Sequence, residues 1–263
     1  MTNLLYPSVK QSPLSMSGMG GLSGSMTFAQ SVYEKGGSNF YDGNDVTRIS
    51  GSGVGALDWG TGQFCIECYL KLMDTVFPSN YEGLWHRWGS TSNLAQCHTY
   101  KFGANNYGIQ VWMYGNVGTG IMFTLENLFT YQQWHHIAFC RHDTGTNGFR
   151  VYVDGTMKYE NTLNAQQTSG TTEPLTWGGR DDTTSYDGDY YISNARWTVG
   201  NDVYDKGTSI TVPNRMLTVV SGTKFLGLQS TTDANAGTSP ANTTISTKRG
   251  SPTPSDENPF DTF

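Results

Sequence analysis

Side chains alternate with a period of two in two neighbouring segments near the middle of the chain. Residues 134–139 and 149–153 are each rich in β-branched or aromatic side chains, which is the pattern of half-buried strands. The residues between them, 141–148, include Gly, Asn and Asp, which adopt the backbone conformations that a chain reversal needs. The second segment stops at another turn pair, Asp154-Gly155. The pattern predicts an antiparallel β-hairpin.

Similar segments recur between turn residues from Phe40 to about Leu228, and almost none of the chain shows the period of a helix. Short strands separated by Gly, Asn and Asp are typical of two-sheet sandwiches. We therefore predict an all-β fold, a two-sheet antiparallel sandwich. The predicted strands cover residues 64–72, 107–114, 121–125, 135–141, 149–153, 190–198 and 223–228.

The composition changes at both ends of this predicted domain, which spans residues 39–230. Residues 1–38 hold too few large apolar side chains to form a core, so we predict an extended N-terminal arm rich in Gly and Ser. Residues 231–263 are rich in Thr, Ser, Asn and Pro. Because proline cannot donate to a sheet ladder, they predict an extended C-terminal tail. Two arrangements stay open: the arms dock on neighbouring subunits, or they fold back on their own sandwich.

Charged residues make up only 14% of the 263 residues, and the formal net charge is -6. Typical soluble domains contain roughly 25%, so we expect a neutral, hydroxyl-rich surface that suits packing against proteins or sugars. Nucleic acid is disfavoured as a partner, because phosphate binding needs clustered Lys and Arg, and Lys248-Arg249 is the one adjacent basic pair. The sequence shows neither a secretory signal nor a membrane span, which predicts assembly in a host cytoplasm without a membrane partner.

Four cysteines occur, and two of them form a CxxC, Cys65 and Cys68. This spacing is found in metal and redox sites, but residues three apart in a strand point to opposite faces of the sheet. Because a secretory signal is lacking, free thiols are favoured over disulfides. We predict that both side chains behave as small hydrophobic groups.

Four segments, in order, resemble the concanavalin A-like, laminin-G-type jelly-roll superfamily over roughly residues 40–230. FYDGN at residues 40–44 and GTGQFCIECYL at 60–70 are similar to that family's YFDG…D and GTGDFTIEFWV. WHHIAFCR and FRVYVDG of the predicted hairpin resemble WHHVAVTR…LRLYVDG, and LTWGGR…GDYYISNARW at 175–197 resembles IGG…F-G-IDDVRI. The resemblance implies a concanavalin A-like jelly roll.

The flanking residues 199–230, together with a tail that reaches Asn258-Pro259-Phe260, resemble jelly-roll proteins of tailed bacteriophage virions, especially those of cyanophages. This branch implies a structural virion protein, of the capsid decoration or fibre type. Its implied partners are the major capsid protein or tail and fibre subunits, copies of itself, and a host surface glycan.

An enzymatic role is disfavoured, because glycoside hydrolases of this superfamily place their carboxylates on one strand in an E-x-D-x-E pattern. No such triplet occurs: Glu67 stands alone in its predicted strand, and Glu126, Glu160 and Glu173 are isolated in predicted loops. The neighbours His135 and His136 face opposite ways in a strand and cannot jointly hold one ion. We therefore expect no catalytic activity.

Calcium is the one cofactor for which the sequence offers candidates. Asp181, Asp182, Asp187 and Asp189 supply oxygen ligands within one predicted loop, and calcium prefers such ligands. The spacing matches no definite calcium motif, and solvated turn carboxylates are common, so the default expectation is that no cofactor is needed.

Aromatic residues give the candidates for ligand contact, since the chain contains seven Trp and fifteen Tyr and their rings stack on sugars or anchor protein interfaces. In residues 109–114 the apolar side chains face one way, which leaves Trp112 and Tyr114 on the other face. Trp85 and Trp88 fall in a predicted loop, residues 83–89. The ligand-contact candidates are Trp85, Trp88, Trp112, Tyr114, Trp177 and Tyr186. Two functions stay open: a virion structural component, and a carbohydrate-binding module for host adsorption; a divergent glycanase is a third, less favoured hypothesis.

Overall fold

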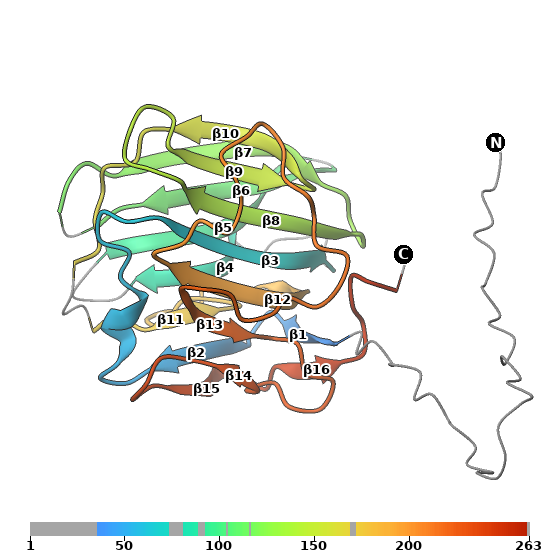
Figure 1. Cartoon of the computed structure of the whole chain (residues 1–263). Coiled ribbons are helices and arrows are strands. Elements are labelled where there is room, and N and C mark those ends of the chain that lie inside the picture. The colour runs from blue at the N-terminus through green and yellow to red at the C-terminus, as the bar shows by residue number, and fades with distance from the viewer. Residues whose placement is uncertain are drawn as a thin grey trace, which may run out of the picture. The chain divides into compact units, whose positions relative to one another are not determined.

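The computed structural model describes residues 36–73, 81–88, 93–103, 105–115, 117–168 and 172–261. Regular structure in these residues is almost entirely β-strand (Figure 1). The elements are β1 (Ser38–Asp42), β2 (Val46–Ser50), the 3-10 helix η1 (Val54–Leu57), β3 (Phe64–Leu72), β4 (Tyr81–Trp88), β5 (Asn93–Gly103), β6 (Asn106–Met113), β7 (Ile121–Phe129), β8 (Trp134–Arg141), β9 (Phe149–Val153), β10 (Thr156–Asn161), β11 (Leu175–Trp177), β12 (Asp189–Val199), β13 (Thr223–Gly227), β14 (Gly237–Thr238), β15 (Thr244–Arg249) and β16 (Thr253–Ser255). Within the described part, no helix has the length and hydropathy that crossing a membrane requires.

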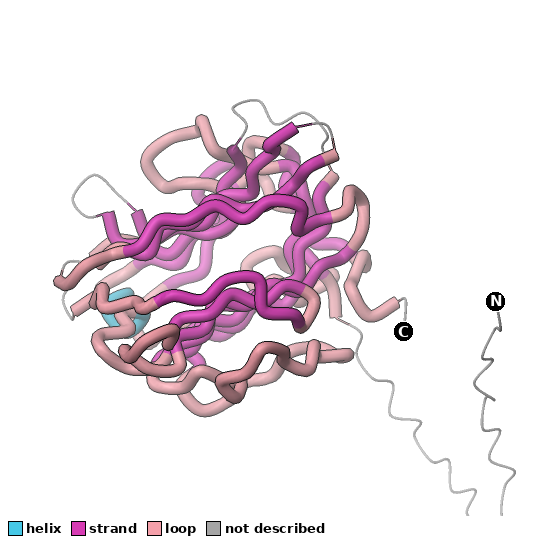
Figure 2. Tube along the Cα trace, turned by 90° about the horizontal axis from the view of Figure 1, so that it is seen from above, coloured by secondary structure: helices cyan, strands magenta, loops and turns pink. Residues whose placement is uncertain are grey.

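The strands form two antiparallel sheets, seen as two layers in Figure 2. The nine-stranded sheet has the order β10-β9-β8-β3-β12-β1-β16, and β13 and β14 are added where β12 extends beyond β1. The seven-stranded sheet has the order β15-β2-β11-β4-β5-β6-β7. The predicted all-β fold with two packed sheets is therefore confirmed, and it is a jelly-roll sandwich.

The predicted hairpin is also confirmed. Strands β8 and β9 pair antiparallel, with Ile137 opposite Val153. The reversal uses Asn147 at φ 55°, and the following turn uses Asp154 at φ 48°. Both lie in the left-handed region that Asn and Asp tolerate better than other non-glycine residues. The turn residues thus set the register of this pair.

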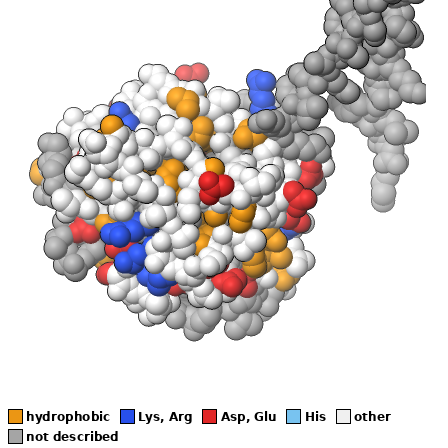
Figure 3. All heavy atoms as spheres, turned by 90° about the horizontal axis from the view of Figure 1, so that it is seen from below, with side chains coloured by type: hydrophobic (Ala, Val, Ile, Leu, Met, Phe, Trp, Pro, Cys, Tyr) orange, Lys and Arg blue, Asp and Glu red, His pale blue; other side chains and the backbone are white. Residues whose placement is uncertain are grey.

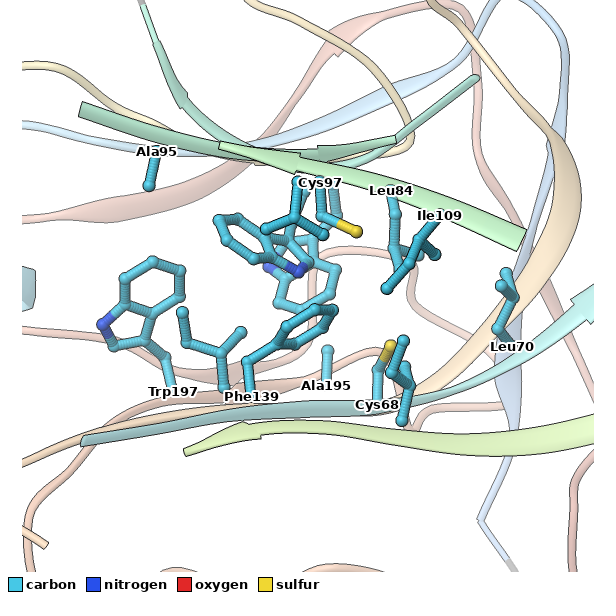
Figure 4. Packing of buried hydrophobic residues seen from close by; sticks show 14 of the residues in the cluster. Cys68, Leu70, Leu84, Ala95, Cys97, Ile109, Phe139, Ala195 and Trp197 are labelled. Carbon is cyan, nitrogen blue, oxygen red and sulfur yellow. The ribbon is translucent and has the colours of Figure 1, made fainter. Parts of the chain in front are cut away.

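The core lies between the sheets and is filled mainly by every second side chain of the central strands. Cys68 and Leu70 of β3 point toward Leu84, Cys97 and Ile109 of the opposite sheet (Figure 4). Burial of one such large apolar side chain contributes about 1.5–3 kcal/mol. Because the strands alternate, Cys65 lies on the other face of β3, where it packs with Cys140 and Tyr152. The two cysteines of the CxxC are buried, free and on opposite faces, as predicted.

Residues 200–222 cover the outer face of the nine-stranded sheet. Tyr204 and Ile210 pack against Cys65, Cys140 and their neighbours. The Tyr152 hydroxyl donates to the Gly207 carbonyl at 2.9 Å. Both faces of β3 are therefore buried, which is why its burial pattern does not alternate.

A buried ionic cluster lies beneath this covering segment. Arg196 of β12 donates to one Glu67 oxygen at 2.8 and 2.5 Å, and Tyr204 and His136 reach the other at 2.6 and 3.1 Å. Burial raises the pKa of Glu67, but the hydrogen bond from His136 and the charge of Arg196 outweigh it, so the pKa lies below its ordinary value. Glu67 is the one carboxylate of its strand, as predicted, yet neighbouring elements supply partners that sequence spacing does not reveal.

The C-terminal segment differs from the prediction. We expected residues 231–263 to form an extended tail outside the domain, but β15 pairs with β2 and β16 pairs with β1. The prediction is wrong because an edge strand is held by backbone hydrogen bonds and needs no apolar pattern. Pro254 is tolerated because β16 lies at the edge of its sheet. The boundary at residue 230 is therefore absent: the described residues before and after it belong to one compact unit.

The prediction for the N-terminal arm concerns residues 1–38. Residues 1–35 lie outside the described residues. Of the remaining three, Ser38 already begins β1, and its buried hydroxyl donates to the Glu257 carbonyl at 2.6 Å. The folded domain therefore begins slightly earlier than the sequence indicated.

Candidate functional site

The outer face of the seven-stranded sheet carries a group of aromatic side chains. In β6, Ile109, Val111 and Met113 are buried in the core, so Trp112 faces outward, as the alternation predicts. Trp112 lies opposite Gln96 of β5 in the strand register. We call the outward-facing group the aromatic face. Its members are Tyr81, Trp88, Tyr100, Phe102, Trp112, Tyr114 and Tyr186, all half-buried.

These rings contact one another across several strands. The ring centroids of Trp88 and Tyr114 lie 6.3 Å apart, and those of Tyr81 and Tyr100 lie 4.6 Å apart. His98 links Trp112, at 5.2 Å, to Tyr186, at 4.9 Å. The structure therefore brings together four of the predicted ligand-contact residues.

Arg180 lies between Trp88 and Tyr186 of the aromatic face. Its guanidinium lies 5.6 Å from the ring centroid of Trp88 and 5.2 Å from that of Tyr186. Asp182 accepts two hydrogen bonds from the same guanidinium, at 2.9 and 2.7 Å. A cation held between aromatic rings keeps their orientation and leaves a polar group beside them.

The loop that carries Arg180 and Tyr186 is held by Arg249, the last residue of β15. Arg249 donates to the carbonyls of Arg180 and Thr183 at 2.7 and 2.6 Å and binds the Asp187 carboxylate at 2.5 and 3.1 Å. Burial raises the pKa of Asp187, and the hydrogen bond from Arg249 opposes this rise. Strand β15 thus positions the loop that carries Arg180 and Tyr186.

Two buried histidines lie beneath the rings. His86 Nδ1 is 2.9 Å from the Gly179 carbonyl oxygen, which only accepts, so Nδ1 carries the hydrogen and His86 Nε2 accepts from His98 Nε2 at 3.1 Å. Burial lowers the pKa of both imidazoles, to about 3 for His98. The pair is therefore neutral at physiological pH and adds no cationic charge to the aromatic face.

The structure shows that two of the predicted ligand-contact residues do not lie on the outer face. Trp85 and Trp177 are fully buried in the core, so neither ring reaches a ligand on the outer face. Residues 83–88 form part of β4 and not the predicted loop. A bulge in β4 between Gly83 and Trp85 turns Trp85 inward, and local sequence does not reveal such a shift.

The calcium candidates do not converge on one point. Asp181 is paired with Arg48 at 2.9 Å, Asp182 with Arg180 at 2.7 Å, and Asp187 with Arg249. Across the described ranges, no group of three His, Cys, Asp or Glu side chains suits a metal ion. Three of the four candidate carboxylates are thus paired with arginines, and Asp189 lies at the start of β12. The expectation that no cofactor is needed, with calcium as the alternative, stays a prediction from the sequence.

Three kinds of site residue were missed by sequence reasoning. Tyr100 and Phe102 show the period-two pattern of a strand, which would have identified them if β5 had been recognised. Arg180 follows two glycines and gives no local signal, since its ring partners come from β4 and from its own loop. His98 looks like an ordinary polar position of a strand, and only the pairing with His86 reveals its place.

The comparisons with known proteins agree with this fold. The model of the concanavalin A-like lectin/glucanases superfamily matches residues 42–197, which is more than half of the 263 residues. The chain belongs to this superfamily and is a lectin-like jelly-roll domain. No curated protein matches the sequence.

Three solved structures illustrate the likeness of the chain path. A native heptameric SAP-like pentraxin from Limulus polyphemus is 12% identical with a TM-score of 0.45, and the match covers 74% of this chain and 96% of the pentraxin. Domain 4 of an extracellular arabinanase from Geobacillus stearothermophilus, in complex with arabinotriose, is 15% identical with a TM-score of 0.38, covering 59% and 68%. The botulinum neurotoxin serotype D binding domain is 10% identical with a TM-score of 0.37, covering 50% and 32%.

Proposed function

We propose that this chain is a non-enzymatic, lectin-like binding module whose aromatic face binds glycans. The observation that carries the proposal is the arrangement of Trp88, Trp112, Tyr114 and Tyr186 around Arg180 on one outer sheet face. Rigid Trp and Tyr rings provide large contact area at low entropic cost, and Arg adds hydrogen-bond donors beside them.

The low charge of the chain and the neutral histidine pair suit a neutral, hydroxyl-bearing ligand at the aromatic face. Charged residues are few in the sequence, and on the face shown in Figure 3 hydrophobic and charged side chains form only small groups. The neutral His86–His98 pair beneath the rings favours neither an anion nor a cation. A glycan, which offers hydroxyl groups and apolar ring faces, matches this chemistry better than a strongly charged ligand does.

A non-enzymatic role is supported by the carboxylates near the aromatic face. Glycosidases need two carboxyl groups about 5–9.5 Å apart, one of them free to donate a proton. Asp181, Asp182 and Asp187 are instead each bound to an arginine. Their oxygens are occupied by these ion pairs, so none of the three is the free carboxyl group that a general acid requires.

A printed glycan array tests the proposal directly. We expect the full-length protein to bind a subset of neutral glycans, and Trp112→Ala and Trp88→Ala to weaken binding of the best glycan by about tenfold or more, since aromatic anchors typically contribute above 1.4 kcal/mol. Phe40→Ala, a half-buried aromatic change on the other sheet, is the control and should leave binding unchanged. Silence across the array, or Trp112→Ala and Trp88→Ala variants that bind like the wild type, would overturn the proposal.

We also propose that the module is displayed on a bacteriophage particle as a structural component. This rests on the sequence resemblance of residues 199–230 and of the C-terminal residues to virion jelly-roll proteins. Deletion of residues 1–33, which precede the compact unit, should prevent incorporation into particles, measured by mass spectrometry of purified virions. Glycan binding by the isolated variant should persist. Normal incorporation of the truncated protein would contradict a role of this arm in assembly.

A further inference from the structure

A cavity lies on the side of the sandwich opposite the aromatic face, on the outer face of the nine-stranded sheet. Its volume is about 730 Å³, within the range of small-molecule sites. Its floor is formed by Tyr69 and Lys71 of β3 and by Trp134 and His136 of β8. These are alternate residues of each strand, so they share the face opposite the core.

Two segments that are distant in sequence form the walls of the cavity. Val212 comes from the segment that covers the sheet, and residues 256–259 and 261 come from the C-terminal segment. The C-terminal segment is fixed by the ion pair between Lys71 and Glu257, at 2.8 Å. The rings of Tyr69 and Phe260 also pack edge to face with centroids 5.3 Å apart. Contacts between segments distant in sequence therefore hold the walls of the cavity in place.

The lining is acidic. Asp154, Asp256, Glu257 and Asp261 contribute carboxylates, whereas Lys71 contributes one ammonium and is already paired with Glu257. Asp154 binds His135 at 2.7 Å. The excess of negative charge favours a ligand that carries a cation and disfavours phosphate, sulfate or a carboxylate.

His136 supplies a buried acceptor in the same lining. Its Nε2 lies 3.1 Å from Glu67, and since the ionised carboxylate only accepts, Nε2 carries the hydrogen. In the neutral ring, Nδ1 is then an acceptor, and this buried atom has no hydrogen-bond partner within the protein. A buried acceptor without a partner costs about 1–3 kcal/mol. Because the side chain of His136 is fully buried, a ligand in the cavity does not reach this acceptor.

We propose that this cavity binds a hydroxylated primary amine, the chemical class of the amino sugars. The ammonium pairs with the lining carboxylates, the hydroxyl groups bond to the polar side chains of Gln132 and Gln133, and Trp134 provides an apolar ring face. This site is separate from the aromatic face and does not depend on the proposed function.

Titration calorimetry on the full-length protein with glucosamine, N-acetylglucosamine and glucose tests this inference, because the three probes differ mainly in the amine. We expect glucosamine to bind at least tenfold more tightly than either neutral sugar. Asp256→Asn removes an exposed carboxylate, and Trp134→Ala removes a half-buried ring; each should weaken glucosamine binding at least threefold.

Asp233→Asn is the matched control, because it removes an exposed carboxylate that does not line the cavity, and it should leave glucosamine binding unchanged. Equal affinity for the three probes, absence of glucosamine binding, or an Asp256→Asn variant with wild-type affinity would overturn the inference. The glycan array tests the aromatic face through Trp112, and the calorimetry tests the cavity through Asp256 and Trp134. A negative result for one proposal is therefore distinguishable from a negative result for the other.

Discussion

Replacement of Glu67 by glutamine is expected to lower the free energy of unfolding by about 3–5 kcal/mol, the cost of removing one partner of a buried ion pair. The side chain of Glu67 is fully buried and that of Arg196 is 5% exposed. The amide has no negative charge to offer the guanidinium, and Tyr204 and His136 lose a charged acceptor. Urea unfolding followed by tryptophan fluorescence measures the difference.

The stability difference between the wild type and Glu67→Gln should depend on pH. Because the pKa of Glu67 lies below its ordinary value of 4.5, its contribution is fully present above that pH and is lost as pH falls through the folded-state pKa. The gap between wild type and Glu67→Gln should therefore narrow in acid. Glu160→Gln, which alters an exposed ion pair with Arg150, should cost less than about 1 kcal/mol. Similar losses for the two variants would contradict a special role of the buried cluster.

Replacement of Arg249 by alanine is expected to destabilise the domain by about 2–3 kcal/mol and to weaken glycan binding about tenfold. Hydrogen bonds to a charged group are worth about 1.5–3 kcal/mol, and this guanidinium serves two carbonyls and a buried carboxylate at once. Without it, Asp187 is left in a buried site and Arg180 and Tyr186 lose the anchor of their loop. Calorimetric unfolding and glycan affinity, measured on the same samples, provide both readouts.

Lys248→Ala is the matched control for that change, because Lys248 is the adjacent basic residue and contacts Asp181 only at 3.8 Å. It should alter the unfolding free energy by less than about 1 kcal/mol and leave glycan binding unchanged. If Arg249→Ala destabilised the protein yet bound glycans normally, Arg249 would be a structural residue without a role in positioning the aromatic face.

The sequence predicted a strand best where buried and exposed side chains alternate along it, or where turn residues lie at its ends. Strands β3 and β9 have the predicted bounds, because apolar residues and adjacent Gly, Asn or Asp mark both ends. Strand β4 was missed because Leu84 to Arg87 are all buried, so no alternation remains to be seen. Strand β15 was missed for the opposite reason: it is polar and is held through its backbone.

Some residues of the candidate site were also predicted correctly from the sequence, and others were misplaced or missed. Trp112 was placed correctly, since its outward direction follows from the apolar residues that flank it in β6. Trp85 was misplaced because a bulge shifts the alternation of β4. Arg180 and Arg249 escaped detection because their contacts join segments far apart in the chain, and no spacing within one strand encodes them.

The pairing of β16 with β1 and of β15 with β2 has a consequence for biosynthesis. Ser38 and Glu257 are 219 residues apart in sequence yet share a hydrogen bond. During translation, β1 and β2 emerge early and must wait for almost the whole chain before their edges are covered. Such long-range closure slows folding and exposes unpaired strand edges to aggregation in the interval. A nascent chain stalled before β15 should therefore depend on chaperones that protect the first two strands.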